Sequence, residues 1–467
     1  MTGNNAPSAR RNAPAAIPYA DAVKVWTRVG AQSFGGPAGQ IAVMHRILVD
    51  EKKWVSEHRF LHALNYCMLL PGPEAQQLAT YLGWLLHGYK GGLTAGLIFI
   101  LPGFLSILAL SWMYVALGDV PLVVALFYGL KAAVLAVVLD ALLRIGGKVL
   151  KNPVKIALAL SAFVALFFFD APFPLVVFGA ALIGLAGGRF TPGVFSPAGA
   201  QPDPDDEADE DSRTIDDILE RDPPAHTRAS AGRAVRVFLT WGTIWAAPVV
   251  LLTALYGGDH VWTVESVFFS KTALVTFGGA YAVLAYIAQE AVAQFGWLEP
   301  GEMLDGLGMA ETTPGPLIMV VQFVGFLGAF RHADGASPMV SGTIGAIVTT
   351  WATFAPCFLW IFLGGPYIEK LRTNRGISAG LAAVTAAVVG VIANLAVWFA
   401  VHVLFGEVRE MSGIFGARLL FPEWSTVQWV PLVLAAGSFA AIRKWKLPMA
   451  VVFGASVALG ALYRLSV

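Results

Sequence analysis

Charged residues are scarce in this chain. They make up 13% of its 467 residues, and the 31 basic side chains equal the 31 acidic ones, so the formal net charge is zero at pH 7. This balance gives no indication of an acidic partner, and no nucleic-acid partner is expected. An ordinary soluble domain, in which about a quarter of the residues are charged, does not have this composition.

Cysteine is rarer still, with two residues, Cys67 and Cys357. Both stand in apolar surroundings, so neither a disulfide framework nor a metal site is expected. The first eighteen residues are polar and lack an apolar core segment, so no cleaved signal is visible. The pair Arg10-Arg11 resembles a twin-arginine signal, but a plain cytoplasmic N-terminus is favoured.

Enzyme motifs are also missing. The sequence contains no nucleophile elbow, phosphate loop, nucleotide fingerprint or metal-ligand cluster. We therefore expect neither an enzyme nor a cofactor.

Apolar residues, by contrast, make up 57% of the chain, and its mean hydropathy is +0.66. Long runs without charge recur, and each meets or approaches the ~20 residues that a helix needs to cross a bilayer. These runs are 91–118, 171–188, 237–258, 335–368, 376–401 and 447–463. The composition predicts an all-α, polytopic integral membrane protein.

One stretch of this sequence occurs twice. Phe34-Gly35-Gly36 precedes Pro71-Gly72-Pro73 by 37 positions, and Phe277-Gly278-Gly279 precedes Pro314-Gly315-Pro316 by the same 37. The offset of 243 residues also aligns Trp54 with Trp297. A repeat of this length predicts two structural halves, and in a membrane protein it is typical of a transporter.

The repeat divides the chain into five segments. We expect an N-terminal tail (1–18), a first repeat (19–188), an acidic linker (189–233), one extra crossing (234–258) and a second repeat (259–467). The linker is too polar to bury a core, which predicts a disordered or loosely helical tether. A regulatory or partner-binding role for it is the alternative.

Basic residues predict the orientation of the two halves. Arg144, Lys148, Lys151 and Lys155 cluster after one apolar helix, which places that end in the cytoplasm. Counting crossings puts the turn at 118–119 outside and the corresponding turn of the second half, at 370–375, inside. The extra crossing therefore inverts the second half, and the pattern predicts an inverted repeat.

The glycine and proline clusters are expected to form the site. Each breaks a helix and frees backbone groups that lipid cannot satisfy, so each must be buried in protein or line a wet cavity. The flanking segments are short, which favours re-entrant hairpins over one full and one broken crossing. A helix that begins at such a break directs its positive end to the cavity, which suits a small anion. Simple kinks in crowded helices are the alternative.

These motifs resemble the chromate ion transporter family. The likeness rests on Phe34 to Pro37, Lys53 to Ser56, Leu69 to Pro73 and Ile98 to Phe104, and in the second copy on Thr276 to Gly279, Gly296 to Leu298 and Thr313 to Pro316. It covers most of the chain except the tail and the linker. The resemblance implies proton-motive-force-driven export of chromate across the bacterial inner membrane, with chromate resistance and with sulfate as a chemical mimic. A proton entering in exchange would add the pH gradient.

A tetrahedral dianion needs fixed positive charge or aligned N–H donors in a low-dielectric core. Arg28 and Lys271 are cations at equivalent positions of the two repeats, seven residues before the first glycine. Snorkelling at a membrane edge is their alternative role. Lys131 stands ~15 Å along its helix, near the bilayer centre, and a structural ion pair is its alternative role.

The full predicted site combines these cations with the breaks. Expected substrate-binding residues are Arg28, Ser33, Gly35, Gly36, Pro71, Gly72, Pro73, Gln77, Lys131, Lys271, Thr276, Gly278, Gly279, Thr313, Pro314, Gly315 and Pro316. Glu74 is the candidate for proton coupling, since a carboxylate beside a dianion must be protonated, although it could simply cap its helix.

Three other functions stay open at this point. The chain could carry sulfate or another anion, or act as a passive anion channel. It could also be a membrane-bound enzyme acting on lipid headgroups, with His45, Glu51, His58 and His62 as an acid/base set.

Overall fold

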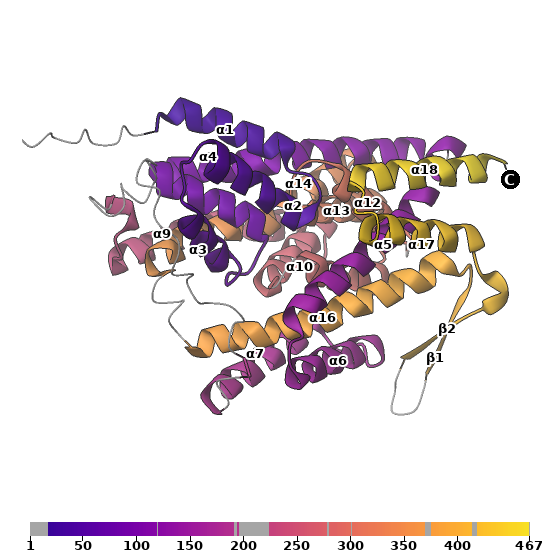
Figure 1. Cartoon of the computed structure of the whole chain (residues 1–467). Helices are drawn as coiled ribbons and strands as arrows, with labels where there is room; N and C mark the ends of the chain where they lie inside the picture. The colour runs from indigo at the N-terminus through magenta and orange to yellow at the C-terminus, as the bar shows by residue number, and fades with distance from the viewer. Residues whose placement is uncertain are drawn as a thin grey trace, which may run out of the picture.

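The computed structural model describes residues 17–118, 120–190, 194–195, 224–277, 280–299, 301–368, 375–412 and 418–466. The tail 1–16, most of the acidic linker, Asp119, Gly278, Gly279 and the turn 369–374 lie outside these ranges. The described part is a bundle of helices, several of them broken or short (Figure 1).

The two halves repeat one order of elements. The first half contains α1 (Tyr19–Gln32), α2 (Gly36–His45), the π-helical turn η1 (Arg46–Glu51), α3 (Glu57–Cys67), α4 (Glu74–Leu117), α5 (Pro121–Val149), α6 (Pro153–Phe167) and α7 (Phe173–Phe190). A short turn, η2 (Ala225–Thr227), and α9 (Ala231–Tyr256) then lead to the second half.

The second half contains α10 (Val261–Val275), α11 (Ala280–Gln289), the π-helical turn η3 (Glu290–Gln294), α12 (Glu302–Thr312), η4 (Leu317–Met319), α13 (Val320–Arg331), α14 (Pro338–Gly364), η5 (Gly365–Tyr367), α16 (Arg375–Leu404), η7 (Trp424–Thr426), α17 (Trp429–Arg443) and α18 (Met449–Ser466). Helix α10 corresponds to α1, α12 to α3, and the α13–α14 pair to the two legs of α4. Even the π-helical turn recurs.

Seven helices in the described ranges are long and apolar enough to cross a membrane. They are Glu74–Leu117, Pro121–Val149, Phe173–Phe190, Ala231–Tyr256, Pro338–Tyr367, Gly376–Leu404 and Met449–Ser466. They include all six runs expected from the sequence, and the all-α, polytopic prediction is confirmed.

Helix α4 shows how the sequence divides lipid from core. Leu97, Leu101 and Leu105, four residues apart, are each more than half exposed, while Phe99 and Gly103 on the other side are buried. Since residues four apart share one helix face, the exposed leucines form a single apolar stripe. In a chain with this composition the stripe faces lipid, and the small residues face neighbouring helices.

The chain folds back on itself at each helix break. Arg46 donates to Gln32 at 2.9 Å, and Arg28 pairs with Glu51, so the end of α2 returns beside the last turns of α1. Helix α4 is itself two legs, because His87 and Gly88 are not helical, and a Cβ built on Gly83 would lie 2.5 Å from the Gly91 carbonyl oxygen. The second of these turns lies at His87 and Gly88 and not at a glycine or proline cluster, so re-entrant hairpins at the clusters themselves stay a prediction.

The later helices are exchanged between the halves. Helix α7 packs against α16 of the second half, and α18 packs against α5 of the first. Helices α6 and α17 repeat the pattern, as α6 lies on α16 and α17 on α5 (Figure 1). This reciprocal packing joins the halves into one body. The opposite orientation of the halves in the membrane stays a prediction of the charge pattern.

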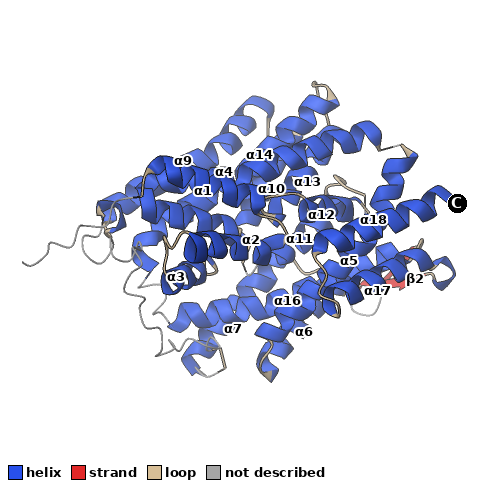
Figure 2. Cartoon of the chain, turned by 45° about the horizontal axis from the view of Figure 1, so that its top comes forward, coloured by secondary structure: helices blue, strands red, loops and turns tan. Residues whose placement is uncertain are grey.

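One element was not predicted. Strands β1 (Val408–Ser412) and β2 (Arg418–Pro422) form an antiparallel hairpin between α16 and α17 (Figure 1), and they are the only paired strands of the described residues, seen in part as the red segment in Figure 2. Its register pairs Arg409 with Phe421 and Met411 with Leu419. The segment is too short and too polar to cross a membrane, so it does not change the fold class.

Candidate functional site

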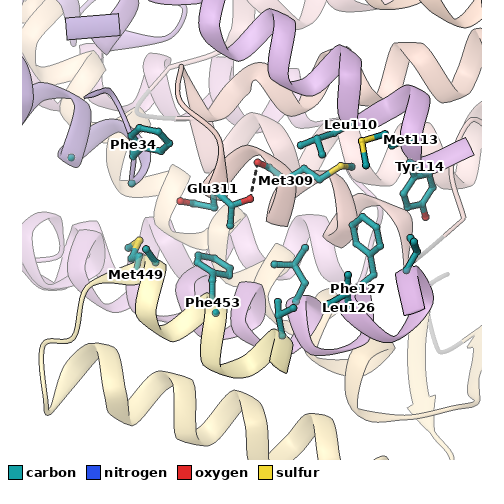
Figure 3. A pocket seen from close by; sticks show the side chains of 18 of the residues that line it. Phe34, Leu110, Met113, Tyr114, Leu126, Phe127, Met309, Glu311, Met449 and Phe453 are labelled. Carbon is teal, nitrogen blue, oxygen red and sulfur yellow. Dashed lines mark hydrogen bonds between the residues drawn. The ribbon is translucent and has the colours of Figure 1, made fainter. Parts of the chain in front are cut away.

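A cavity of about 880 Å³ opens beside the first helix break. Phe34, Gly35 and Gly39 line one end, together with Glu311 and Thr312 from the end of α12. Figure 3 shows Phe34 and Glu311 at this end and Tyr114 at the other, with Leu, Met and Phe side chains between them. The cavity therefore has apolar walls and a polar end at the break.

The break has a local cause. Gly35 and Gly36 take φ values of +80° and +70°, which side chains with a Cβ adopt only under strain. Helix α1 ends before Ser33, whose hydroxyl donates to the Val29 carbonyl at 2.7 Å, and Pro37 stands in the first turn of α2. The second copy has the same end, since Thr276 donates to the Thr272 carbonyl at 2.7 Å.

Glu311 is the buried acid of the cavity. Its side chain is 4% exposed, and the hydroxyl of Tyr281 donates to its Oε1 at 2.5 Å. Its Oε2 has no hydrogen-bond partner among the described residues. A Cβ built on Gly36 would lie 3.7 Å from Oε2, so the carboxyl group sits beside the N-terminal end of α2.

Arg144 brings positive charge to the same cavity. It lies near the end of α5 and is exposed, and it forms no ion pair or side-chain hydrogen bond with any residue in the described ranges. It acts electrostatically on both Glu311 and Tyr281 but contacts neither carboxyl oxygen directly. The cavity thus holds a cation and an acid that are near but unpaired.

The two breaks hold the halves together through backbone hydrogen bonds. The Gly72 N–H donates to the Thr276 carbonyl at 2.7 Å, and the Gly315 N–H donates to the Ser33 carbonyl at 2.9 Å. The two bonds are equivalent, because Gly72 corresponds to Gly315 and Thr276 to Ser33 in the repeat. The Pro-Gly-Pro of each half is therefore bound to the glycine break of the other, and these two N–H groups already have partners within the protein.

The remaining residues of these motifs lie around that junction. Gln77 donates to the Pro71 carbonyl at 2.7 Å, and Thr313 donates to the Met309 carbonyl at 2.8 Å. Pro73 precedes α4, whose first residue is Glu74, and Pro316 precedes η4. Pro314 packs its carbonyl oxygen toward Gly103. Gly278 and Gly279 lie outside the described residues. A role in substrate binding stays a prediction for all of these motif residues.

The predicted cations do not come together. Arg28 makes two hydrogen bonds to Glu51, at 2.5 and 3.1 Å, and these bonds lower the pKa of Glu51. Lys271 is exposed and makes no ion pair within the described ranges. Of the predicted site residues that the structure describes, Gly35 alone lines the large cavity.

Lys131 belongs to a charge cluster beyond the other end of the cavity, in which the two acids are buried and the two cations are partly exposed. Its Nζ lies 3.2 Å from Asp305 Oδ2, and Tyr114 donates its hydroxyl to the same oxygen at 2.9 Å. Nearby, Arg331 grips Glu302 through two bonds of 2.6 and 2.7 Å. The cluster therefore contains two cations and two acids. The contact between Lys131 and Asp305 agrees with a structural ion pair, the alternative role that the sequence left open for Lys131.

Removing one partner of this pair should test that alternative. We expect Lys131→Met to destabilise the protein by about 3–5 kcal/mol, because it leaves Asp305 buried and uncompensated. Adding Asp305→Leu should restore most of the thermal midpoint, since it removes the orphaned charge. A double variant that regains both the wild-type thermal midpoint and activity identifies a structural pair, whereas a stable but inactive double variant identifies Lys131 as a residue of the site.

Sequence reasoning missed both charged groups of the cavity. Arg144 was interpreted with Lys148, Lys151 and Lys155 as a marker of the cytoplasmic side. Glu311 was not among the predicted site residues, and its equivalent in the first repeat is the uncharged Met68. The available signal was an acid in an apolar segment, three residues before Pro314.

The histidines of the first half make local contacts. His45 lies against Glu57 and within 3.5 Å of Asp50, and the rings of His58 and His62 stack at 6.4 Å. None of the four residues of the suggested acid/base set lines the large cavity.

Comparison with known proteins gives a consistent result. A protein-family model described as chromate transporter matches residues 20–185 and 266–461, one segment in each half. A chromate transport protein of Pseudomonas aeruginosa is 31% identical over 441 residues, covering 91% of this chain and 92% of the relative. A probable chromate transport protein of Synechococcus elongatus is 27% identical, with 90% and 93% covered.

A further relative, the chromate transport protein of Cupriavidus metallidurans, is 28% identical and spans 79% of this chain and 80% of its own length. No solved structure matches the chain.

Proposed function

Because this chain belongs to the chromate transporter family, we propose that it carries chromate out of the cell across the bacterial inner membrane. The multi-pass helical fold is that of a membrane protein. The proposal extends the family assignment in two respects, the outward direction and the use of the proton motive force.

The observation that carries the proposal is the charged end of the cavity. Arg144 and the N-terminal end of α2 face one space between helices of both halves. A tetrahedral oxyanion needs such donors, because desolvation of a dianion in an apolar environment is costly. An Arg side chain can grip two oxygens at once, which matches the geometry of this class of anion.

The membrane potential supplies a driving force in the proposed direction. With the interior negative, each negative charge that moves outward gains about 2.3 kcal/mol per 100 mV. Chromate carries two negative charges, so voltage alone favours its export. Sulfate has the same shape and charge, and we expect it to compete for the site.

Expression in a chromate-sensitive bacterium should test this function. We expect expressing cells to accumulate less labelled chromate and to grow at higher chromate concentrations than cells with an empty vector. Energised everted vesicles should take up chromate, and an uncoupler should reduce that uptake.

The control is a variant that reaches the membrane in equal amount but carries Arg144→Ala. Equal chromate retention in cells with and without the protein, at matched expression, would count against export.

A further inference from the structure

The buried acid at the cation end of the cavity raises a question that anion binding alone does not answer. Glu311 lies beside the N-terminal end of α2 and near Arg144, the positive groups that would hold the substrate. A carboxylate and a dianion cannot both occupy this small polar end at low energy, because the apolar walls around them weaken dielectric screening. One of the two charges must be neutralised.

We propose that Glu311 binds a proton whenever an oxyanion binds beside Arg144. In the empty site Glu311 is ionised and its unpartnered Oε2 faces the end of α2. When the anion arrives, it takes over those positive groups, and the carboxyl group takes up one proton. The inference rests on the proposed function and assigns the proton site of the same cavity.

The contacts of Glu311 fit both protonation states. The Tyr281 hydroxyl donates to Oε1, so this oxygen is satisfied while the carboxylate is charged. Oε2 has no hydrogen-bond partner in the part of the chain that the structure describes, which leaves it free to carry the proton. The side chain is 4% exposed yet lines an open cavity, so a proton can reach a group that bulk water does not screen.

Other charged groups around Glu311 do not replace it in this role. From α5, Arg144 and Asp140 act on this region, and Asp140 is bound to Arg443 of α17 at 3.2 Å. From α11, Tyr281 is the hydroxyl donor already described. Helix α2 contributes the amide of Gln40, which donates to the Gly315 carbonyl at 2.6 Å. On α12 itself, Asp305 is paired with Lys131.

The direction in which pH changes anion affinity follows from the reciprocity of two coupled binding equilibria. If the anion favours protonated Glu311, then protonation must favour the anion by the same factor. Anion affinity should therefore rise as pH falls, by at most about tenfold per pH unit for one proton. Exchange of a proton for the anion at one site requires the opposite dependence. A proton carried with a dianion also reduces the transported charge from two to one.

The experiment measures sulfate binding to the purified, full-length protein by calorimetry between about pH 5.5 and 8.5. Sulfate is the probe because it stays a dianion over this range, whereas chromate does not. We expect affinity to increase toward low pH, with uptake of about one proton per anion where the slope is steepest. Repeating the titration in buffers of different ionisation enthalpy counts the protons directly.

Glu311→Gln is the decisive variant, since the amide mimics the protonated carboxyl and keeps an acceptor for Tyr281. It should bind sulfate tightly at all these pH values, without proton uptake. Glu407→Gln, which neutralises an exposed acid before β1, should behave as the wild type.

Each outcome decides one point. If neither sulfate nor chromate binds the folded protein at any pH, the proposed function fails. If binding occurs but does not depend on pH, or if Glu311→Gln keeps the wild-type dependence, the inference about Glu311 is overturned. Loss of proton uptake in Glu74→Gln instead would assign the proton to the residue that the sequence favoured.

Discussion

Arg144→Ala should reduce the apparent affinity for chromate by about ten- to a hundredfold. A hydrogen bond to a charged group contributes about 1.5–3 kcal/mol, which corresponds to about a ten- to hundredfold change in affinity. Arg144→Lys should retain more activity than the alanine variant, because it keeps the charge but loses the planar fork that grips two oxygens. Initial rates of labelled chromate uptake into everted vesicles measure both effects.

Lys148→Ala is the matched control for Arg144. Lys148 lies one turn further along the same helix and does not line the cavity. It should transport chromate at the wild-type rate and with the wild-type dependence on concentration. Uptake by Arg144→Ala that cannot be distinguished from the Lys148 control would remove Arg144 from the site.

Gly315→Ala should prevent the two halves from closing on each other. Gly315 has a φ of +111°, and a Cβ at this position would lie 2.7 Å from the Cα of Gly103. The strained backbone costs about 1–3 kcal/mol, and the forced separation of packed helices costs about as much again. The shift would also break the bond from the Gly315 N–H to the Ser33 carbonyl. We expect the variant to have a lower thermal midpoint and to aggregate in detergent. Thermal unfolding measures the first effect, and size-exclusion chromatography measures the second.

Two further glycines sharpen this test. Gly72→Ala at the equivalent break should be less damaging, because its nearest contacts are the side chains of Gln77 and Cys357, which can move more easily than backbone. Gly147→Ala on α5 meets nothing within 4 Å and should leave stability unchanged or slightly improved. Wild-type stability of Gly315→Ala would show that the junction tolerates separation.

The two halves are similar in backbone but not in charge. Both have the glycine break, the π-helical turn and the reciprocal hydrogen bond, yet the position in the first half that corresponds to Glu311 is occupied by Met68. Arg144 belongs to the first half and Glu311 to the second, so the polar end of the cavity beside Gly35 combines charges from both halves.

The sequence by itself determined the membrane class, the duplication and the positions of the breaks. These depend on local physics. Apolar runs of the right length form helices in lipid, and glycine or proline interrupts a helix wherever it stands. The bonds that Ser33 and Thr276 make one turn back are local in the same sense. For this reason the repeated motif could be interpreted without coordinates.

Only the tertiary structure decided which charges share the cavity. Arg144, Tyr281 and Glu311 come from α5, α11 and α12, and they meet because the break of each half binds the Pro-Gly-Pro of the other. The same packing places Lys131 against Asp305 and Arg28 against Glu51, away from one another. No spacing in the sequence encodes these encounters, since they depend on how helices from two halves cross. A charged side chain acts on whatever lies within a few ångströms of it, and that neighbourhood is a property of the folded chain.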